Sequence, residues 1–285
     1  MPQLRWYDGG SLVVSDWHCP GQSLGTGPEE SAPAFEVSIG RVGSHTIRAV
    51  DGETVVEGTR LLCINAGEVF RPVRRTLGLD RRTRITLSAD AMRELVGAAG
   101  HNPRRFPTRT VALTARAALA HHELLRAVQA ASRDELAIHS LALELVAHAG
   151  HGQPLRHAVR PTVAVGAAIR AIQELLARRF AEPLTLAVLA AHVDLSPWHL
   201  SRRFHSEVGL GLHQYRTRLR LLSALHRIRD SRRPDLARVA FEVGFSSHSH
   251  LSREFRAFFG VPPSHVYWRR VGAENAVRRL DLAAR

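Results

Sequence analysis

The same short stretch, His-Leu-Ser-Arg-x-Phe, occurs twice in this chain, beginning at His199 and again at His250. Each copy places an arginine at its fourth position, Arg202 in the first and Arg253 in the second. A guanidinium group is a planar fork of donors that can bond both acceptors on the major-groove edge of guanine. A single surface arginine is usually satisfied by water or a carboxylate. Two arginines at matched positions of a repeated helix instead favour base recognition.

The repeat extends toward the N-terminus, because residues 186–195 match residues 236–245 in their apolar and small positions. Each copy therefore predicts a helix, a tight turn and a second helix, which is the helix-turn-helix arrangement. Gly244 suits a turn residue with a positive φ, and Asp194 belongs to one of the few other residue types that tolerate one.

The second helix of each copy divides into an apolar face and a polar face at the helical period. Its predicted N-caps are Ser196 in the first copy and Ser247 in the second. The predicted inward rows are Leu200, Phe204 and Val208, and Leu251, Phe255 and Phe258. The predicted outward rows are Trp198, Arg202 and His205 with Ser201 beside them, and Ser249, Arg253 and Arg256 with Ser252 beside them. The sequence leaves open whether Trp198 covers an apolar protein surface or packs on a thymine methyl group or a sugar.

A connecting helix is predicted between the two copies, near residues 213–229. Its length of about 17 residues gives roughly 26 Å at 1.5 Å per residue. Such a rod could hold two recognition helices about one DNA turn apart, near 34 Å. The candidates for phosphate contact are Arg216, Arg218 and Arg220 in this helix and Arg256 in the second helix of the second copy. For the three arginines of the connecting helix, a solvated helix face is an equally good interpretation.

The basic charge of the chain is concentrated in its C-terminal half. All 39 basic residues are arginine, and the net charge is +13. Residues 1–160 carry 19 arginines against 16 acidic residues, whereas residues 161–285 carry 20 against 10. This asymmetry indicates one half that binds a polyanion and one half with another role. The two cysteines, Cys19 and Cys63, and the lack of a signal-like or membrane-spanning run lead us to expect a cytoplasmic protein.

The N-terminal half changes from strand-like to helix-like patterns near residue 88. Residues 6–87 contain short β-branched runs separated by Gly or Pro, with an Asp-Gly pair at 51–52 that is typical of a hairpin. Ser88 is a predicted N-cap, and residues 108–149 predict two amphipathic helices that pack on the sheet or on a second subunit. The predicted fold class is α+β with two domains: an antiparallel β sandwich with helices, followed by an all-α domain with two helix-turn-helix units.

Over residues 163–270 the pattern resembles the AraC/XylS family of bacterial transcription regulators. The resemblance is carried by LTLAVLAAHVDLSPWHLSRRFHSEVG and by DLARVAFEVGFSSHSHLSREFRAFFGVPPSHV. It implies a seven-helix domain whose two helix-turn-helix units enter the major groove on one face of the duplex. The base-contacting positions of the family map onto Trp198, Ser201 and Arg202 and onto His248, Ser249, Ser252 and Arg253. His248 and Ser249 stand where several members have longer amides, so the DNA site of a relative does not transfer to this chain.

The strand pattern and domain order of the N-terminal half resemble the cupin-type sensor domain found ahead of this module. The resemblance implies a ligand-binding or dimerising role for residues 1–95 and a dimer contact for the helices of 108–149. The candidate effector-binding residues are Trp6, Phe35, Val37 and Ile64. The implied partners are double-stranded DNA, an unknown small-molecule effector, a second copy of the chain and, for an activator, RNA polymerase. The predicted segments are a sensor domain at 1–95, a helical segment at 96–149, a linker at 150–161, a DNA-binding domain at 162–271 and a tail at 272–285.

A metal-dependent cupin enzyme fused to a helical protein-interaction domain is the main alternative. Such a site needs two or three histidines and a carboxylate that converge, and the predicted strands offer only His18 and His45. The pair His121 and His122 lies in a predicted helix and is expected to be solvated. The sequence contains no phosphate-cradling Gly loop and no nucleophile elbow, so we expect no enzyme, no metal and no cofactor. A protein-binding role for the basic half also stays open, and the salt dependence of duplex binding separates it from DNA recognition.

Overall fold

The computed structural model describes residues 3–21, 23–75, 77–97, 105–130, 134–151, 163–231 and 234–266. The predicted linker beyond residue 151 and the predicted tail at 272–285 lie outside these ranges. Within them, no helix is long and apolar enough to cross a membrane.

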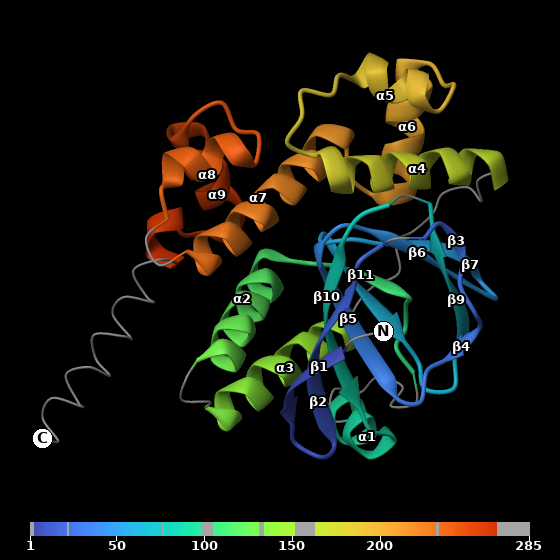
Figure 1. The fold of residues 1–285 in the computed structure, drawn as a ribbon, viewed down its shortest axis with the longest axis vertical. Coiled ribbons are helices and arrows are strands. Elements are labelled where there is room, and N and C mark those ends of the chain that lie inside the picture. Colours follow the sequence, from blue (N-terminus) through green and yellow to red (C-terminus); the bar gives the residue numbers. More distant parts are fainter. Residues whose placement is uncertain are drawn as a thin grey trace, which may run out of the picture. The chain divides into compact units, whose positions relative to one another are not determined.

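The N-terminal half forms two antiparallel sheets (Figure 1). The larger sheet has the order β1 (Gln3–Asp8), β2 (Leu12–Cys19), β10 (Asp80–Leu87), β5 (Phe35–Val42), β8 (Arg60–Ile64) and β11 (Thr110–Ala112). The smaller sheet has the order β3 (Gly25–Thr26), β9 (Val69–Arg74), β6 (His45–Ala49) and β7 (Gly52–Val56), and β4 (Glu30–Ser31) also pairs with β9. The predicted antiparallel β class is confirmed, as is the hairpin at the Asp-Gly pair, which joins β6 to β7.

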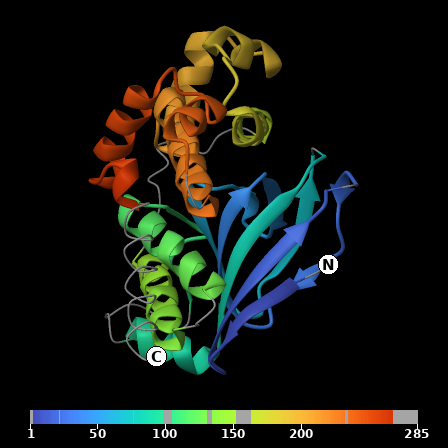
Figure 2. The ribbon, with the colours of Figure 1, turned by 60° about the vertical axis from the view of Figure 1, so that its left-hand side comes forward.

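The larger sheet has one apolar face, which three helices cover (Figure 2). Ile85 in β10 pairs with Val14 in β2 and Val37 in β5, and all three side chains are fully buried. The covering helices are α1 (Ala89–Gly97), α2 (Ala115–Gln129) and α3 (Glu135–Gly150). Strand residues alternate between faces, so the residues between these apolar positions point to the opposite side, toward the smaller sheet.

The helices α2 and α3 pack on each other, and α3 contacts β5, which confirms the predicted packing on the sheet. The expectation that His121 and His122 are solvated is wrong, because each is only 1 % exposed. The His121 Nε2 lies 2.8 Å from the Thr83 hydroxyl of β10 and so joins α2 to the sheet. Periodicity alone misplaced these histidines, because helices packed on one another and on a sheet bury more than one stripe of each helix. The predicted dimer role of α2 and α3 stays a prediction.

The C-terminal half is helical throughout its described residues. Its helices are α4 (Val163–Arg179), α5 (Leu186–His192), α6 (Pro197–Val208), α7 (Leu212–Asp230), α8 (Leu236–Glu242) and α9 (His248–Phe259). The chain divides into two compact units, 1–219 and 220–285, and the division falls inside α7. The first unit therefore holds the two sheets together with α4, α5 and α6, and the second unit holds α8 and α9.

Each helix-turn-helix is built from the local signals that the repeat predicted. Ser196 accepts a hydrogen bond from the His199 backbone N–H at 3.2 Å, and Ser247 accepts the equivalent bond from His250 at 3.1 Å. The turn residue is Asp194 in the first copy, with φ 53°, and Gly244 in the second, with φ 90°. Both predicted N-caps and both positive-φ turns are confirmed.

The inward row of the second copy differs from the prediction by one residue. Leu251, Phe255 and Phe259 are buried, whereas Phe258 is only half-buried. The buried row therefore repeats at i, i+4 and i+8, as Leu200, Phe204 and Val208 do in α6. Phe259 packs against the Phe255 ring with centroids 4.3 Å apart, which supplies the apolar partner that holds it inside.

The turn at Asp194 gives a first testable prediction. We expect Asp194→Val to lower the free energy of unfolding by about 1–2 kcal/mol, because a β-branched residue is strained at positive φ. The matched change Asp194→Gly should leave stability equal or higher, because glycine adopts this conformation without strain. Denaturant unfolding followed by circular dichroism measures both changes, and an equal loss for Val and Gly would contradict the turn geometry.

Candidate DNA interface and internal cavity

The outward face of α6 presents an arginine supported by a tryptophan. Trp198 is 64 % exposed at the start of the helix, and the Arg202 guanidinium carbon lies 4.4 Å from the centroid of its ring. Ser201 is exposed beside them. Arg202 is exposed, and among the described residues it has no ion pair and no side-chain hydrogen bond, so its donors face solvent. A stacked guanidinium keeps its in-plane donors free for an acceptor edge such as guanine.

The outward face of α9 presents the second set in the same helical positions. His248, Ser249 and Arg253 are exposed, and Ser252 is half-buried. The Arg253 side chain is 71 % exposed, and within the described part of the chain it pairs with Glu254 across a long Nε to Oε1 distance of 3.4 Å. An exposed ion pair of this kind contributes little, so the guanidinium remains available to an external acceptor.

The four arginines that were predicted to contact phosphate lie in different environments. The predicted phosphate contact of Arg216 is corrected. Its Nε donates to the Phe180 carbonyl at 2.8 Å and its Nη1 donates to the Leu184 carbonyl at 3.0 Å. These bonds fix the loop that follows α4, so Arg216 has a structural role. Arg256 is exposed on α9 and fits a phosphate contact.

Arg218 and Arg220 are both half-buried and both have interactions within the chain. Burial lowers the pKa of Arg218, and the Arg220 guanidinium carbon lies 5.8 Å from the Phe245 ring centroid. Neither residue has the open solvent exposure of Arg256, so the support for a phosphate contact is weaker at these two positions.

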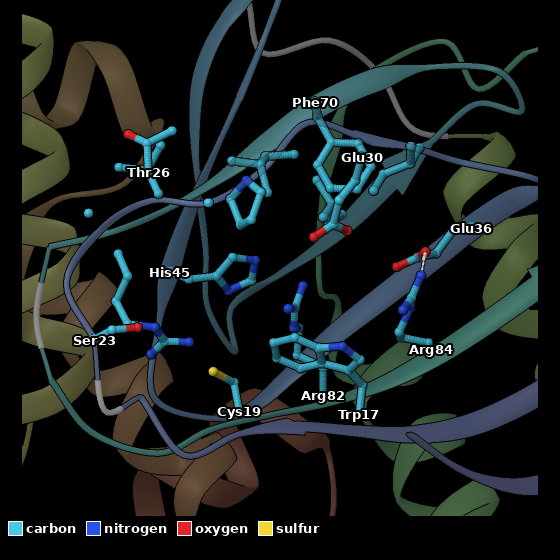
Figure 3. A pocket seen from close by; sticks show the side chains of 18 of the residues that line it. Trp17, Cys19, Ser23, Thr26, Glu30, Glu36, His45, Phe70, Arg82 and Arg84 are labelled. Carbon is cyan, nitrogen blue, oxygen red and sulfur yellow. Dashed lines mark hydrogen bonds and ion pairs between the residues drawn. The ribbon is translucent and has the colours of Figure 1, made fainter. Parts of the chain in front are cut away.

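A cavity of about 150 Å³ lies between the two sheets of the N-terminal half (Figure 3). The larger sheet lines it with Trp17, Cys19, Glu36, Leu62, Ile64, Arg82 and Arg84. The smaller sheet lines it with Gly25, Thr26, Glu30, His45, Ile47, Phe70, Pro72, Val73 and Arg74. The cavity therefore combines apolar walls with three arginines and two glutamates.

One of the four predicted effector residues, Ile64, lines this cavity. The predicted effector-binding role of Phe35 and Val37 is corrected. Both residues lie on the other face of β5, together with Ile85 under the helices. Trp6 is also outside the cavity lining and stacks with Arg41 instead, 5.1 Å from the guanidinium carbon to the ring centroid. The sequence signal that could have found the site is the charged alternation Arg82, Thr83, Arg84 in a strand that is otherwise buried.

A buried carboxylate organises the charges beside the cavity. The Asp80 Oδ2 lies 3.0 Å from His45 Nδ1, 3.7 Å from Arg82 Nε and 3.8 Å from Arg74 Nη2. Burial acts to raise the pKa of Asp80, but His45 and Arg82 outweigh it and bring the pKa to about 2. Burial, together with the charge of Arg82, lowers the pKa of His45. Asp80 is thus ionised and His45 is neutral at neutral pH.

The described residues hold no group of three or more His, Cys, Asp and Glu side chains that could bind a metal ion. His45 is committed to Asp80 in the interior, and His148 lies 3.0 Å from the Ala112 carbonyl.

The two environments of arginine give a second testable prediction. We expect Arg216→Ala to lower the free energy of unfolding by about 1–3 kcal/mol, because it leaves two backbone carbonyls without their donors. Arg256→Ala should leave stability within about 0.5 kcal/mol and reduce the slope of log binding constant against log salt by about one unit. Thermal unfolding and salt titration of DNA binding measure the two effects. A loss of stability in Arg256→Ala together with a reduced salt slope in Arg216→Ala would contradict these roles.

Comparisons with known proteins place the repeat in a family. Residues 189–269 match a family model described as a helix-turn-helix domain. A stretch of 99 residues is 32 % identical to the multiple antibiotic resistance protein MarA of Escherichia coli strain K12, covering 35 % of this chain and 76 % of that protein. A stretch of 87 residues is 34 % identical to the transcriptional activator RhaS of Escherichia fergusonii, covering 30 % of this chain and 31 % of that protein.

Among solved structures, ToxT from Vibrio cholerae O395 aligns over 90 % of this chain and 97 % of its own, with 10 % identity and a TM-score of 0.35. The family assignment comes from the helix-turn-helix match and from MarA, of which this chain covers more than two thirds. The chain belongs to the AraC family of helix-turn-helix transcription regulators.

Proposed function

We propose that this regulator reads two separate segments of one operator, one with α6 and one with α9. The observation that carries the proposal is the pair of N-capped helices that expose an arginine at the same position, Arg202 and Arg253. Buried apolar rows fix which face of each helix points outward. Each exposed face then suits the major groove, where arginine contacts with guanine give specificity.

In this proposal the residues around each arginine complete the base contacts. Trp198 and Ser201 act with Arg202 on α6, and the α9 set consists of His248, Ser249, Ser252 and Arg253. Arg256 supplies a phosphate contact that positions the helix without reading sequence. Since both helices belong to one polypeptide, residues 162–271 suffice in this proposal as the DNA-binding domain, without a second copy of the chain.

We also propose that a small molecule in the cavity controls DNA binding. Support comes from contacts inside the first compact unit. Arg74, which lines the cavity, donates to the Gly78 carbonyl at 3.2 Å. Arg178 of α4 donates to the adjacent Leu77 carbonyl at 2.9 Å and to the Ser44 carbonyl, also at 2.9 Å.

These contacts join the cavity wall to the helix-turn-helix through short backbone segments. Ser44 directly precedes His45, which lines the cavity, and α4 contacts α6 through a shared apolar core that includes Ile172, Leu176 and Phe204. A ligand that shifts Arg74 or His45 would therefore change the environment of α4. A coupled two-site system of this kind is what effector control requires.

The base-reading proposal gives a third testable prediction. We expect Arg202→Ala and Arg253→Ala each to lose about 1–3 kcal/mol of discrimination at one base position. The two positions should differ and lie about ten base pairs apart. Binding of each variant to a complete set of single-base operator variants measures the effect.

Arg238→Ala is the matched control, because Arg238 is an exposed arginine of α8 that pairs with Glu242 and lies outside both outward rows. It should leave the base preferences unchanged. If both recognition variants relax the same base pair, or if neither relaxes any, the two helices do not read separate segments. A uniform loss across all sequences would instead make the arginine a phosphate contact.

The control proposal gives a fourth testable prediction. With a ligand that raises the melting temperature of the full chain, we expect Arg178→Ala to keep ligand binding but to lose most of the ligand-dependent change in DNA affinity. Arg179→Ala is the control, because the neighbouring Arg179 pairs with Glu182 on an exposed surface and has no hydrogen bond, in the described ranges, to the backbone segments that Arg178 bonds. Calorimetry measures ligand affinity and fluorescence anisotropy measures DNA affinity. An unchanged response in Arg178→Ala would rule out this route of coupling.

A further inference from the structure

We propose that the cavity between the sheets takes a small monocarboxylic acid, with its carboxylate on Arg82 and a body about the size of one ring against the apolar wall. This inference rests on the proposed effector control and names the chemical class of the effector. Three observations support it. The Arg82 guanidinium is buried without a hydrogen bond to any described residue, the charges around Asp80 leave a positive surplus, and the cavity has a matching size and lining.

The Arg82 guanidinium is buried without a hydrogen bond among the described residues. Its side chain is 10 % exposed, and its Nε is buried without a partner. The nearest carboxylate oxygen, Oδ2 of Asp80, lies 3.7 Å from Nε, beyond hydrogen-bond distance. Trp17 stacks on the guanidinium at 3.7 Å and so covers one of its faces without accepting its N–H groups. Buried donors in proteins usually have an acceptor, and this guanidinium is placed to donate to one from outside the chain.

The buried charges near Arg82 also leave a positive surplus. Arg84 is paired with Glu36 across the sheet. Arg74 and Arg82 share the single carboxylate of Asp80, and His45 is neutral because burial lowers its pKa. Two guanidinium groups thus face one carboxylate in a setting where water cannot screen them. A ligand with one negative charge balances this group.

The remaining carboxylate of the lining belongs to Glu30. Its residue is exposed on β4, so solvent screens its charge. In Figure 3, the carboxylate of Glu30 lies below Phe70 and points toward the side of the cavity that holds Arg82 and Trp17. The anionic end of the ligand is expected on Arg82, because Arg82 is the least exposed of the three lining arginines and is not paired at hydrogen-bond distance within the described ranges.

The rest of the lining suits a compact apolar body. Ile47, Leu62, Ile64, Phe70 and Pro72 supply aliphatic and aromatic surface. The cavity volume of about 150 Å³ equals that of an engineered cavity that binds benzene. A single ring or a short branched chain fills such a space.

Matched acid and amide pairs test this inference on the full-length protein. The probes are benzoate with benzamide, phenylacetate with phenylacetamide and hexanoate with hexanamide, and benzylamine tests whether Glu30 and Glu36 set the charge preference instead. Melting temperature at constant ionic strength gives the ranking, and calorimetry gives the affinity of the best acid. We expect at least one acid, and none of the amides or the amine, to raise the melting temperature.

The residue assignment is tested by Arg82→Gln, with Arg81→Gln as its matched control. Arg81 is the preceding residue of β10 and pairs with Asp16 on the other face of the sheet. Arg82→Gln should weaken binding of the acid roughly 10- to 100-fold, because a charge-assisted hydrogen bond is lost. Arg81→Gln should leave the affinity within about twofold. If Arg82→Gln does not fold, the acid and amide comparison on the unaltered protein still decides the charge preference.

Three results would overturn the inference: no acid binds, an amide or the amine binds as tightly as its acid, or the acid binds Arg82→Gln unchanged. Binding of a neutral compound that still alters DNA affinity would remove the anionic class and leave effector control standing. Binding of an acid that leaves DNA affinity unchanged would confirm the site and remove the control proposal.

Discussion

Burial of one apolar row on each recognition helix is the constraint on which the DNA interface depends. Leu200, Phe204 and Val208 are inside on α6, so the rotation of that helix about its axis is fixed. Trp198, Ser201 and Arg202 are then outside by geometry alone. The same reasoning holds for α9, where the row ends at Phe259. The capped turns before each helix set where the helix begins and therefore which residues reach furthest outward.

The N-terminal half is organised by a sheet that has one apolar face and one charged face. The larger sheet has an apolar face under three helices and a face with arginines toward the smaller sheet. Alternation along β10 produces both faces from adjacent residues, since Thr83 and Ile85 point to the helices while Arg82 and Arg84 point to the cavity. Asp80 at the start of that strand holds Arg82 and Arg74 of β9 near one another. One strand thus contributes to the core and to the proposed ligand site.

Much of the helical half was predictable because its signals are local. Serine caps, a glycine or aspartate at the turn and an apolar repeat at helical spacing all lie within about twenty residues of one another. The cavity was not predictable in the same way. The alternation in β5 identifies two faces, but only the long-range placement of α1, α2 and α3 decides which face is covered, so Phe35 and Val37 were assigned to the wrong side. The burial of His121 and the hydrogen bonds that Arg216 donates to backbone carbonyls likewise depend on partners far away in sequence.

The stacking of Arg202 on Trp198 has a consequence for the order in which contacts form. An arginine side chain that becomes fixed loses rotamer entropy equivalent to about 1.5–2 kcal/mol. On α6 the indole already restricts those rotamers before any DNA is present, whereas Arg253 on α9 has only a long, exposed contact with Glu254. The first helix is therefore preorganised and the second must be ordered on arrival. In the proposed interface, α6 is then the more rigid reader and α9 the more adaptable one, and changes in operator sequence are expected to be better tolerated under α9.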